Sequence, residues 1–486
     1  MRNTLSLLAL AGALLFSGTA AHAVSQQCGD VDGNDSITSS DALAALRAAV
    51  GSSVELDCGP RGKLLRTGQT ACFDASGAVV ACEGSGQEGS ITRGIIRSSV
   101  DNDDGTIFDE VTGLVWEKLS DDGGIHDRDA ALSWDQAFEK IDQLNAGEYA
   151  GHDDWRLPNA FELLTLANLG RSDPAYYLAH FGDDCEAECT SLQCNCPPAD
   201  SWSSTTYVPE PDRAWLVSAQ DGRLFADDKP ALHAVRAVRG GFIAEIIGSQ
   251  AGGRGGSAAG GAVETTFGSP CGDVDLSHTV TASDALAILK AAVGQPGELR
   301  CSPRAETLQT GQTQCYDSAG AVIACAGTGQ DGELQSGAPR AFADNGDGTV
   351  TDLTTGLMWE KLSDDGTVHD HDDAGVWTDA FAKIAALNAA LFAGHDNWRL
   401  PNIFEAATLL DLGSADPAMQ EVFDETCSDG CTVTTCSCAP AAERQWSSTS
   451  YAAAPAQAWT IVVDDGATDP HPKDQTAAVR AVRAGN

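Results

Sequence analysis

Apolar residues recur at regular intervals twice along the chain. Between residues 134 and 144 they fall at i, i+3, i+4 and i+7 steps, which places them on one face of a helix. The same stripe returns 243 residues later, between residues 377 and 387. We therefore expect one amphipathic helix in each half, with its apolar face in a core. The residues of the two stripes are Trp134, Ala137, Phe138, Ile141 and Leu144, and Trp377, Ala380, Phe381, Ile384 and Leu387.

A second helix is expected at Asn159–Leu169, where apolar residues cover most faces and predict burial. Asp101–Thr106 is interpreted as a hairpin turn rather than a calcium loop, because its fifth position is glycine. Runs of β-branched and aromatic residues predict strands around the helices. The predicted strands are residues 113–118, 201–205, 214–217 and 233–239, and in the second half 356–361, 446–449, 458–463 and 478–483. Each half is therefore expected to be an α+β domain.

A nine-residue stretch occurs in both halves, as GHDDWRLPN at Gly151–Asn159 and as GHDNWRLPN at Gly394–Asn402. The asparagine that ends each copy is followed three residues later by a glutamate, which is a capping-box pattern for a helix start. We interpret the stretch as scaffold. Each tryptophan is expected to anchor a core, and each arginine to satisfy buried carbonyls or a carboxylate. The residues concerned are Trp155, Arg156, Trp398 and Arg399.

The chain has 16 cysteines, eight in each half at matching spacings. An even number in each half favours disulfides within it. We expect Cys72–Cys82 and Cys315–Cys325 to bridge the strands of two hairpins, and Cys28 to pair with Cys58. Pairing within the two four-Cys clusters is left open; zinc is the alternative there, which the C-x-C spacing disfavours. The cysteines are Cys28, Cys58, Cys72, Cys82, Cys185, Cys189, Cys194 and Cys196, and Cys271, Cys301, Cys315, Cys325, Cys427, Cys431, Cys436 and Cys438.

The N-terminus has the features of an export signal. Arg2 precedes an apolar run, Leu5–Phe16, that is too short to span a bilayer, and Ala21–Ala23 is an A-x-A cleavage site. An uncleaved membrane anchor is the alternative. No later stretch is expected to cross a membrane, so no transmembrane segment is expected after signal removal. A secreted, periplasmic or cell-surface location agrees with the expected disulfides.

Composition and repetition divide the chain into six parts. They are 1–23, a signal peptide; 24–60, a calcium-loop segment; 61–240, a first domain with an N-terminal disulfide hairpin; 241–268, a Gly/Ser-rich linker; 269–303, a second calcium-loop segment; and 304–486, a second domain.

The net charge is −41 at pH 7. Such a charge repels phosphates, so it argues against nucleic acid as a partner, and it disfavours acidic lipid surfaces and sulfated sugars. It suits calcium, basic partners or simple solubility.

Two segments carry oxygen side chains at positions 1, 3, 5, 7, 9 and 12 of a twelve-residue loop, the spacing that wraps Ca²⁺. Position 6, usually glycine, is Asp35 or His278. A helix is expected next, at Asp41–Val50 for the first loop. A polar turn without an ion is the alternative, more so for the second loop, whose position 5 is only serine. The predicted ligands are Asp30, Asp32, Asn34, Ser36 and Asp41, and Asp273, Asp275, Ser277, Thr279 and Asp284.

These segments resemble halves of a type I dockerin, the calcium-loop-plus-helix repeat that docks to cohesins. The resemblance implies a docking function. Dockerins carry two adjacent repeats, however, whereas these two lie about 240 residues apart.

Two other loops carry candidate chemistry. Acidic loops with histidine at residues 121–129 and 364–373 offer carboxylate and imidazole ligands for a metal, and a solvated loop is the alternative. The offset between the halves changes only around the four-Cys clusters, which predicts an exposed, disulfide-stapled loop. That loop is either where binding specificity lies or merely a tolerant surface segment.

The motifs WEK, WRLPN, WSST and VRAVR follow in the same order over about 140 residues of each half. This set resembles the domain family named for the C-terminal domain of the Legionella collagen-like protein. The resemblance implies two tandem C-type-lectin-like domains, with adhesion or ligand binding at a surface. The RLPN-x-x-E element is also similar to one in the formylglycine-generating enzymes, which share that fold.

We therefore expect an exported, non-catalytic binding or adhesion protein with Ca²⁺ as its cofactor and a glycan or surface protein as its ligand. The first alternative is a docking component of an extracellular assembly, acting through the dockerin-like segments. The second is an enzyme of the formylglycine-generating type, which needs reactive cysteines or copper.

Overall fold

The computed structural model describes residues 39–49, 64–177, 185–197, 199–240, 282–292, 305 and 307–484. The chain divides into two compact units, one formed by residues 1–59 and 269–301 and one by residues 60–268 and 302–486.

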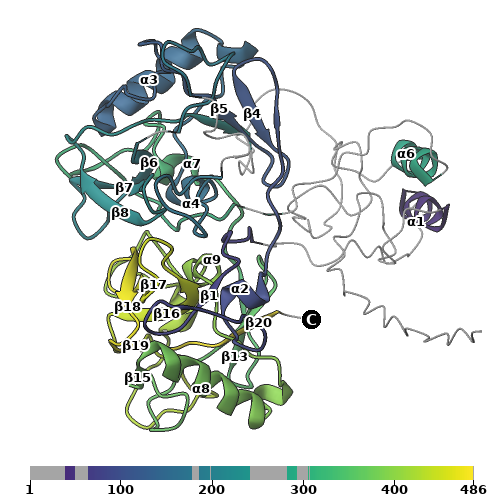
Figure 1. Cartoon of the computed structure of the whole chain (residues 1–486), viewed down its shortest axis with the longest axis vertical. Helices are drawn as coiled ribbons and strands as arrows, with labels where there is room; N and C mark the ends of the chain where they lie inside the picture. The colour runs from purple at the N-terminus through teal and green to yellow at the C-terminus, as the bar shows by residue number, and fades with distance from the viewer. Residues whose placement is uncertain are drawn as a thin grey trace, which may run out of the picture. The chain divides into compact units, whose positions relative to one another are not determined.

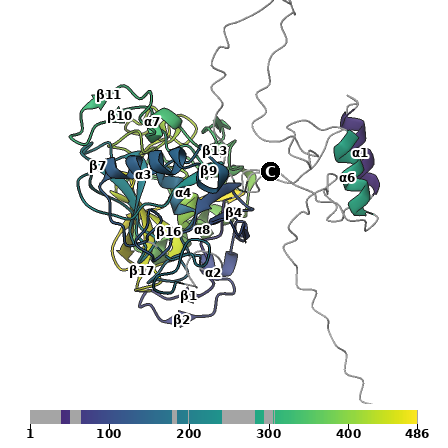
Figure 2. The same ribbon diagram turned by 90° about the horizontal axis from the view of Figure 1, so that it is seen from above.

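The smaller unit contains two helices, α1 (Ser39–Ala49) and α6 (Ala282–Ala292), which pack side by side (Figure 2). The buried residues of these helices are alanines and one isoleucine, whereas Leu43 and Leu46 of α1 remain 48% and 41% exposed. The helix expected after the first calcium loop is therefore present, but its leucines lie outside the contact. The buried residues are Ala42, Ala45, Ala285 and Ile288.

The larger unit contains two domains with the same architecture, which we define as the first domain (residues 96–240) and the second domain (residues 339–484). Each has an antiparallel four-stranded sheet that the last strand of the domain closes. Its order is β3-β4-β5-β9 in the first domain and β12-β13-β14-β20 in the second. The bounds are β3 (Ser99–Asp101), β4 (Thr106–Asp109), β5 (Leu114–Glu117) and β9 (Val238–Gly240), and β12 (Phe342–Asp344), β13 (Thr349–Asp352), β14 (Leu357–Glu360) and β20 (Val482–Ala484).

A second sheet in each domain packs with the helices. Its order is β6-β7-β8 in the first domain and β15-β19-β16-β17-β18 in the second. The strands are β6 (Ser201–Thr206), β7 (Arg213–Val217) and β8 (Leu224–Asp228), and β15 (Ala374–Gly375), β16 (Arg444–Ser450), β17 (Gln457–Val462), β18 (Thr468–Pro472) and β19 (Ala477–Ala478). The helices are α3 (Trp134–Ala146), η1 (Tyr149–Gly151) and α4 (Ala160–Leu164), and α8 (Trp377–Ala389), η2 (Phe392–Gly394), α9 (Ile403–Ala407) and η3 (Glu421–Phe423). The α+β prediction is thus confirmed.

The expected amphipathic helices are α3 and α8. Trp134 and its copy Trp377 are buried at their starts, and each packs into a core of its own domain. The hairpin turn expected at Asp101–Thr106 is also present, because it joins the antiparallel strands β3 and β4.

Three predicted elements are shorter than expected or interrupted, and one of them, the strand predicted at residues 478–483, is divided into β19 and β20. The helix predicted at Asn159–Leu169 ends at Leu164, because the Thr165 amide and hydroxyl both turn back to the Glu162 carbonyl. The strand predicted at residues 233–239 is reduced to β9. Arg236 is the cause: its side chain is buried and donates to the carbonyl oxygens of Glu117 and Cys196, which breaks the alternation that a strand requires.

A hairpin segment precedes each domain, and we define the two as residues 64–95 and residues 305–338. Each has a two-stranded hairpin and a short helix. They are β1 (Cys72–Phe73), β2 (Val79–Val80) and α2 (Glu88–Ile91), and β10 (Cys315–Tyr316), β11 (Val322–Ile323) and α7 (Asp331–Leu334). Disulfides Cys72–Cys82 and Cys315–Cys325 close them, the two pairs that the hairpin pattern requires.

The hairpin segments are exchanged between the domains. The first segment packs on the second domain, where α2 contacts β16, and the second segment packs on the first domain, where α7 contacts β6 (Figure 1). Residues of both domains and both segments also share one apolar core, which contains Leu65, Phe161, Leu308 and Phe404. The sequence-based division assigned each hairpin segment to the domain that follows it. Each segment does contact that domain, where the amides of Leu169 and Leu412 donate to the carbonyls of Thr67 and Thr310 at 2.7 Å, but its short helix packs on the other domain.

Candidate functional site

The repeated WRLPN stretch is buried scaffold in both domains. Trp155 and Trp398 are each 2% exposed. Arg156 donates from both terminal nitrogens to the two carboxylate oxygens of Glu162, at 2.6 and 2.7 Å. Arg399 makes the same bidentate pair with Glu405, at 2.6 Å for each bond. The interpretation of these residues as structural agrees with this arrangement.

The helix entrance after the stretch contacts the exchanged hairpin segment. Asn159 Oδ1 accepts from the Glu162 amide at 2.8 Å, and the Glu162 carboxylate accepts from the Asn159 amide at 2.9 Å, so the expected capping box is present. Asn159 Nδ2 also donates to the Ser336 carbonyl of the second segment at 2.8 Å. The helix start of the first domain is therefore also a docking point for the other half of the chain.

Each exchanged segment brings one carboxyl into the buried contact. Asp331 is 1% exposed, and its Oδ2 accepts from the hydroxyls of Thr205 and Thr310 at 2.7 and 2.6 Å. Burial raises its pKa to about 6, while these hydrogen bonds act in the opposite direction. The charges of Glu162 and Arg156 act on it with opposite signs.

Glu88 occupies the matching place in the other contact. It is 2% exposed and accepts from the Thr67 hydroxyl at 3.0 Å. Burial raises its pKa to about 8; the charge of Glu405 adds to the rise, and the Thr67 hydrogen bond and the charge of Arg399 oppose it. Both contacts thus place a carboxyl whose pKa is raised by burial beside the arginine–glutamate pair of the opposite domain.

Two glutamines complete the docking contacts in the manner of a strand partner. Gln69 Nε2 donates to the Ser450 carbonyl at 2.7 Å, and the Ser450 amide donates to Gln69 Oε1 at 2.8 Å. Gln312 makes the same pair with the backbone of Thr206, at 2.9 Å for each bond. Each glutamine therefore satisfies both backbone groups of a residue at the end of a strand in the opposite domain.

The two domains also touch through matching tyrosines. Tyr207 donates to Asp465 at 3.1 Å, and Tyr451 donates to Asp221 at 3.1 Å. Because the glutamine and tyrosine contacts of one half are returned by the corresponding residues of the other half, the two halves are related by an approximate twofold symmetry.

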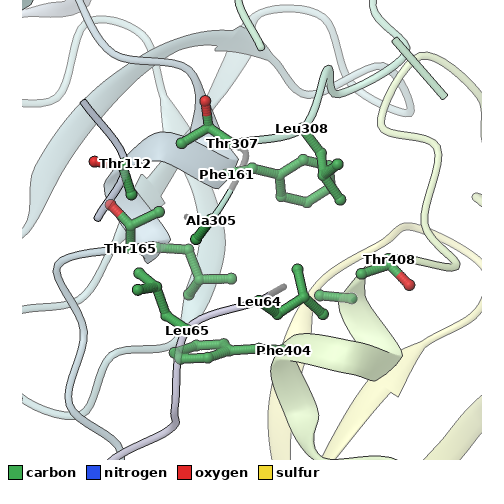
Figure 3. Close-up of a pocket in the computed structure, with 12 residues that line it drawn as sticks. Leu64, Leu65, Thr112, Phe161, Thr165, Ala305, Thr307, Leu308, Phe404 and Thr408 are labelled. Atoms are coloured by element: carbon green, nitrogen blue, oxygen red, sulfur yellow. The ribbon is translucent and has the colours of Figure 1, made fainter. Parts of the chain in front are cut away.

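The cavity at this junction is small and apolar (Figure 3). It has a volume of about 60 Å³, and Phe161 with Leu308 faces Phe404 with Leu65 across it. Ligand pockets for small organic molecules are typically about 300 to 1,000 Å³. The cavity therefore marks imperfect packing near the symmetry axis rather than a ligand site.

A buried glutamate from the WEK motif organises the interior of each domain. Glu117 is fully buried, and its Oε1 lies 2.8 Å from His126 Nδ1 and 2.9 Å from Lys140 Nζ. Burial acts to raise its pKa, but the charge of Lys140 and the His126 contact prevail and lower it. Its other oxygen accepts from the Ala237 amide at 2.8 Å. Glu360 makes the corresponding contacts in the second domain, so we assign this cluster to stability.

The four-Cys loops lie beside the acidic loops. Their disulfides are Cys185–Cys196 and Cys189–Cys194, and Cys427–Cys438 and Cys431–Cys436. The Cys189 carbonyl accepts from the Asp121 amide at 2.9 Å, and the Cys431 carbonyl accepts from the Asp364 amide at 3.0 Å. The expected exposure holds for the tip, where Leu192 is 63% exposed, whereas Cys194 and Cys196 are buried. All described cysteines are disulfide-bonded, which leaves none of them as a zinc ligand.

The predicted calcium ligands are not placed by the structure. Asp30, Asp32, Asn34 and Ser36, and Asp273, Asp275, Ser277 and Thr279, lie outside the described residues, as do Cys28, Cys58, Cys271 and Cys301. Asp41 and Asp284 belong to α1 and α6, but their side chains are outside the description as well. Of the helices that are described, none combines the length and the apolar character needed to cross a membrane.

Two stretches, residues 105–239 and 348–483, match the family model of the Lcl C-terminal domain. Together they cover more than half of the chain. The chain belongs to the Lcl C-terminal domain family. Each match coincides with one of the two domains, which we now call the first and second Lcl domains, and both hairpin segments lie outside the matches. Comparison with curated proteins gives no match.

The residues that join the two Lcl domains were not among those predicted from the sequence. They are Gln69, Glu88, Gln312 and Asp331, together with Lys229 and Lys473, which donate to the carbonyls of Asp317 and Asp74. The available signal was the recurrence of these polar residues at matching positions of the two halves, the glutamines and carboxylates in segments expected to be simple hairpins and the lysines within the domains.

Proposed function

We propose that this chain is an exported, non-catalytic binding or adhesion protein whose two Lcl domains act as a fixed pair. The reciprocal docking of the hairpin segments carries this proposal. It holds the two domains in one orientation, so two equivalent surfaces are presented with a constant spacing. Family membership supports an adhesion-type role. The cysteines that the structure describes are all in disulfides, so none of them offers a thiol for formylglycine-type chemistry.

The ligand surface that we favour in each Lcl domain is the tip of the four-Cys loop together with the neighbouring acidic loop. The tips are exposed at Leu192 and at its counterpart Thr434, and the two copies differ in length only near this loop. Loops held by a rigid scaffold commonly carry binding specificity. A net charge of −41 favours a neutral or basic ligand, either a glycan or a surface protein.

A fixed pair of surfaces binds a repetitive target more tightly than one surface alone. Linking two binding events can raise apparent affinity by about 10²- to 10⁴-fold when both surfaces engage one target. The test begins with a screen of glycans and surface proteins, run with and without Ca²⁺. Hits are then remeasured with Leu192→Asp, with Thr434→Asp and with both changes.

Each single variant is expected to lose avidity for an immobilised, repetitive target while it keeps binding to the soluble monovalent ligand. The double variant is expected to lose both. Unchanged binding by the double variant, with the fold intact, would place the ligand site elsewhere.

Disulfides and the signal-like N-terminus support a periplasmic or extracellular location for this role. Ca²⁺ in the two loops at residues 30–41 and 273–284 would stiffen the segments that precede the Lcl domains. This part of the proposal rests on the ligand spacing in the sequence.

A second candidate function, docking to a larger assembly, is favoured by one observation. The helices α1 and α6 follow the two dockerin-like loops and pack side by side although they are far apart in sequence. The two half-repeats therefore meet in one unit, as adjacent repeats would. A pull-down from the extracellular fraction in Ca²⁺ and in chelator tests this candidate, and a partner retained equally in both would argue against it.

A further inference from the structure

The second Lcl domain carries an imidazole and two carboxylates that converge on one point of its surface. His371 Nε2 lies 3.9 Å from Asp364 Oδ1 and 3.7 Å from Asp372 Oδ1. These ligand atoms all lie within 4.8 Å of one another. We propose that His371, Asp364 and Asp372 bind a divalent transition-metal ion, and that the matching position of the first Lcl domain does not.

The separations are close to those that a bound ion requires. Zinc bonds to imidazole and carboxylate are about 2.0 to 2.2 Å long, which places two ligands of a tetrahedral ion about 3.3 Å apart. The two separations from His371 Nε2, 3.9 and 3.7 Å, exceed this value by about half an ångström. Asp364 is 27% exposed and Asp372 is 69% exposed, so both carboxylates have room to close that distance by side-chain rotation.

The other face of the imidazole fixes which nitrogen is available. His371 Nδ1 lies 3.1 Å from the carbonyl oxygen of Ala439, which can only accept a hydrogen bond. Nδ1 therefore carries a proton, and in the neutral ring the lone pair of Nε2 faces the two carboxylates. Histidines that bind metals usually donate their second ring N–H to a backbone carbonyl or carboxylate in this way.

The first Lcl domain supplies an independent observation at the same place. Its residue corresponding to His371 is Arg128, whose Nη2 lies 3.5 Å from Asp121 and whose Nε lies 3.7 Å from Asp129. Asp121 and Asp129 correspond to Asp364 and Asp372. The same pair of carboxylates thus already faces a cation in one copy of the fold. Guanidinium has no lone pair to give to a metal, so in this copy Arg128 supplies positive charge to its carboxylates in place of a metal ligand.

The composition of the cluster selects the class of metal. Calcium and magnesium prefer oxygen ligands alone, whereas imidazole combined with carboxylate suits zinc and its first-row neighbours. The Cys427–Cys438 disulfide lies beside His371, but its sulfurs are bonded to each other and are not ligands. We therefore infer a site with three protein ligands and its remaining positions open to water.

A metal at this position would brace the four-Cys loop of the second Lcl domain. The Asp364 amide donates to the Cys431 carbonyl at 3.0 Å, and the Ala441 amide donates to the His371 carbonyl at 3.1 Å. The ligands thus come from a loop that is hydrogen-bonded to both sides of the four-Cys loop. The metal site does not depend on the proposed ligand function, because it is defined by these side chains alone.

The test uses the full chain without a metal-binding tag and measures bound Zn²⁺ after dialysis against micromolar Zn²⁺ in millimolar Ca²⁺. The excess Ca²⁺ keeps the predicted calcium loops from taking zinc. His371→Arg reproduces the residue of the first copy, and Arg128→His reproduces that of the second. His395→Arg, a change of another partly exposed histidine of the same domain, is the matched control.

We expect His371→Arg to bind one zinc ion fewer per chain than the wild type, and Arg128→His to bind one more. His395→Arg should bind as many as the wild type. Zinc should also raise the unfolding temperature of the wild type and not that of His371→Arg. The proposal is overturned if His371→Arg keeps the full zinc content, if Arg128→His gains none, or if His395→Arg loses as much as His371→Arg.

Discussion

Replacing Glu88 with glutamine should remove a pH dependence from the stability of the docked pair. Folding raises the pKa of this carboxyl from 4.5 to about 8, chiefly through burial in the contact with the second Lcl domain. An acid with a raised pKa stabilises the folded state while it is protonated. Its contribution is therefore complete below pH 4.5 and is lost as the pH rises to about 8.

The magnitude follows from the same interval. Stability changes by about 1.4 kcal/mol for each pH unit between the two pKa values, which gives a total of about 5 kcal/mol. Glutamine is neutral at every pH, and its carbonyl oxygen can still accept from the Thr67 hydroxyl. The Glu88→Gln variant should therefore match the wild type near pH 4.5 and exceed its stability by up to about 5 kcal/mol above pH 8.

The assay is the difference in unfolding midpoint between variant and wild type, measured from acid to mildly alkaline pH at constant Ca²⁺. Asp331→Asn is the matched control, because burial raises the pKa of Asp331 from 3.8 to about 6. Its difference should develop between those two values and then stay constant. If the profiles of Glu88→Gln and the wild type run parallel from pH 4.5 to 8, Glu88 does not carry the pH dependence that we assign to it.

Three further predictions concern the scaffold and the calcium loops. Trp155→Ala should cost about 3 to 5 kcal/mol of unfolding free energy because the side chain is buried, and a fully stable variant that had lost ligand binding would contradict the structural role. Gln69→Ala should cost about 2 to 5 kcal/mol in thermal denaturation, because it leaves two buried backbone groups of the second Lcl domain unsatisfied, whereas the exposed Gln143→Ala should cost almost nothing. Titration of the isolated calcium-loop segments should show tighter Ca²⁺ binding at residues 30–41 than at residues 273–284, and the opposite order would refute the ligand assignment.

Features that depend on neighbouring residues could be predicted from the sequence. The capping box of Asn159 and Glu162 joins residues three apart, and the Cys72–Cys82 disulfide joins residues ten apart. Local patterns of this kind contain both partners of the interaction. The core position of Trp134 followed from the same reasoning, because one helical stripe shows its own buried face.

The exchange of hairpin segments could not be predicted in this way. Gln69 and its partner Ser450 are 381 residues apart. The two halves also carry the same motifs, so the pattern is identical whether a hairpin packs on its own domain or on the other one. Only the length and direction of the connecting chain distinguish the two arrangements, and residue patterns do not contain that information.

The spacing of apolar residues along the sequence also gave a wrong buried face or a wrong helix length in two places. Leu43 and Leu46 recur at a helical interval that usually marks a core, yet alanines form the buried face of α1. Leu166 and Leu169 are buried as expected, but they follow α4 in a turn rather than extend it. In both cases the apolar residues are present as expected. Which of them are buried, and whether the helix continues through them, depends on packing partners elsewhere in the chain.

The exchanged hairpins also fix the order in which the protein can mature. The first Lcl domain ends at residue 240, but the segment that covers its WRLPN helix is complete only at residue 338. During synthesis, docking on the first domain therefore waits for about one hundred further residues. The second domain uses a segment that was made long before it. A chain interrupted between the halves would leave the first domain without the second hairpin segment, and the first segment without its contact to β16.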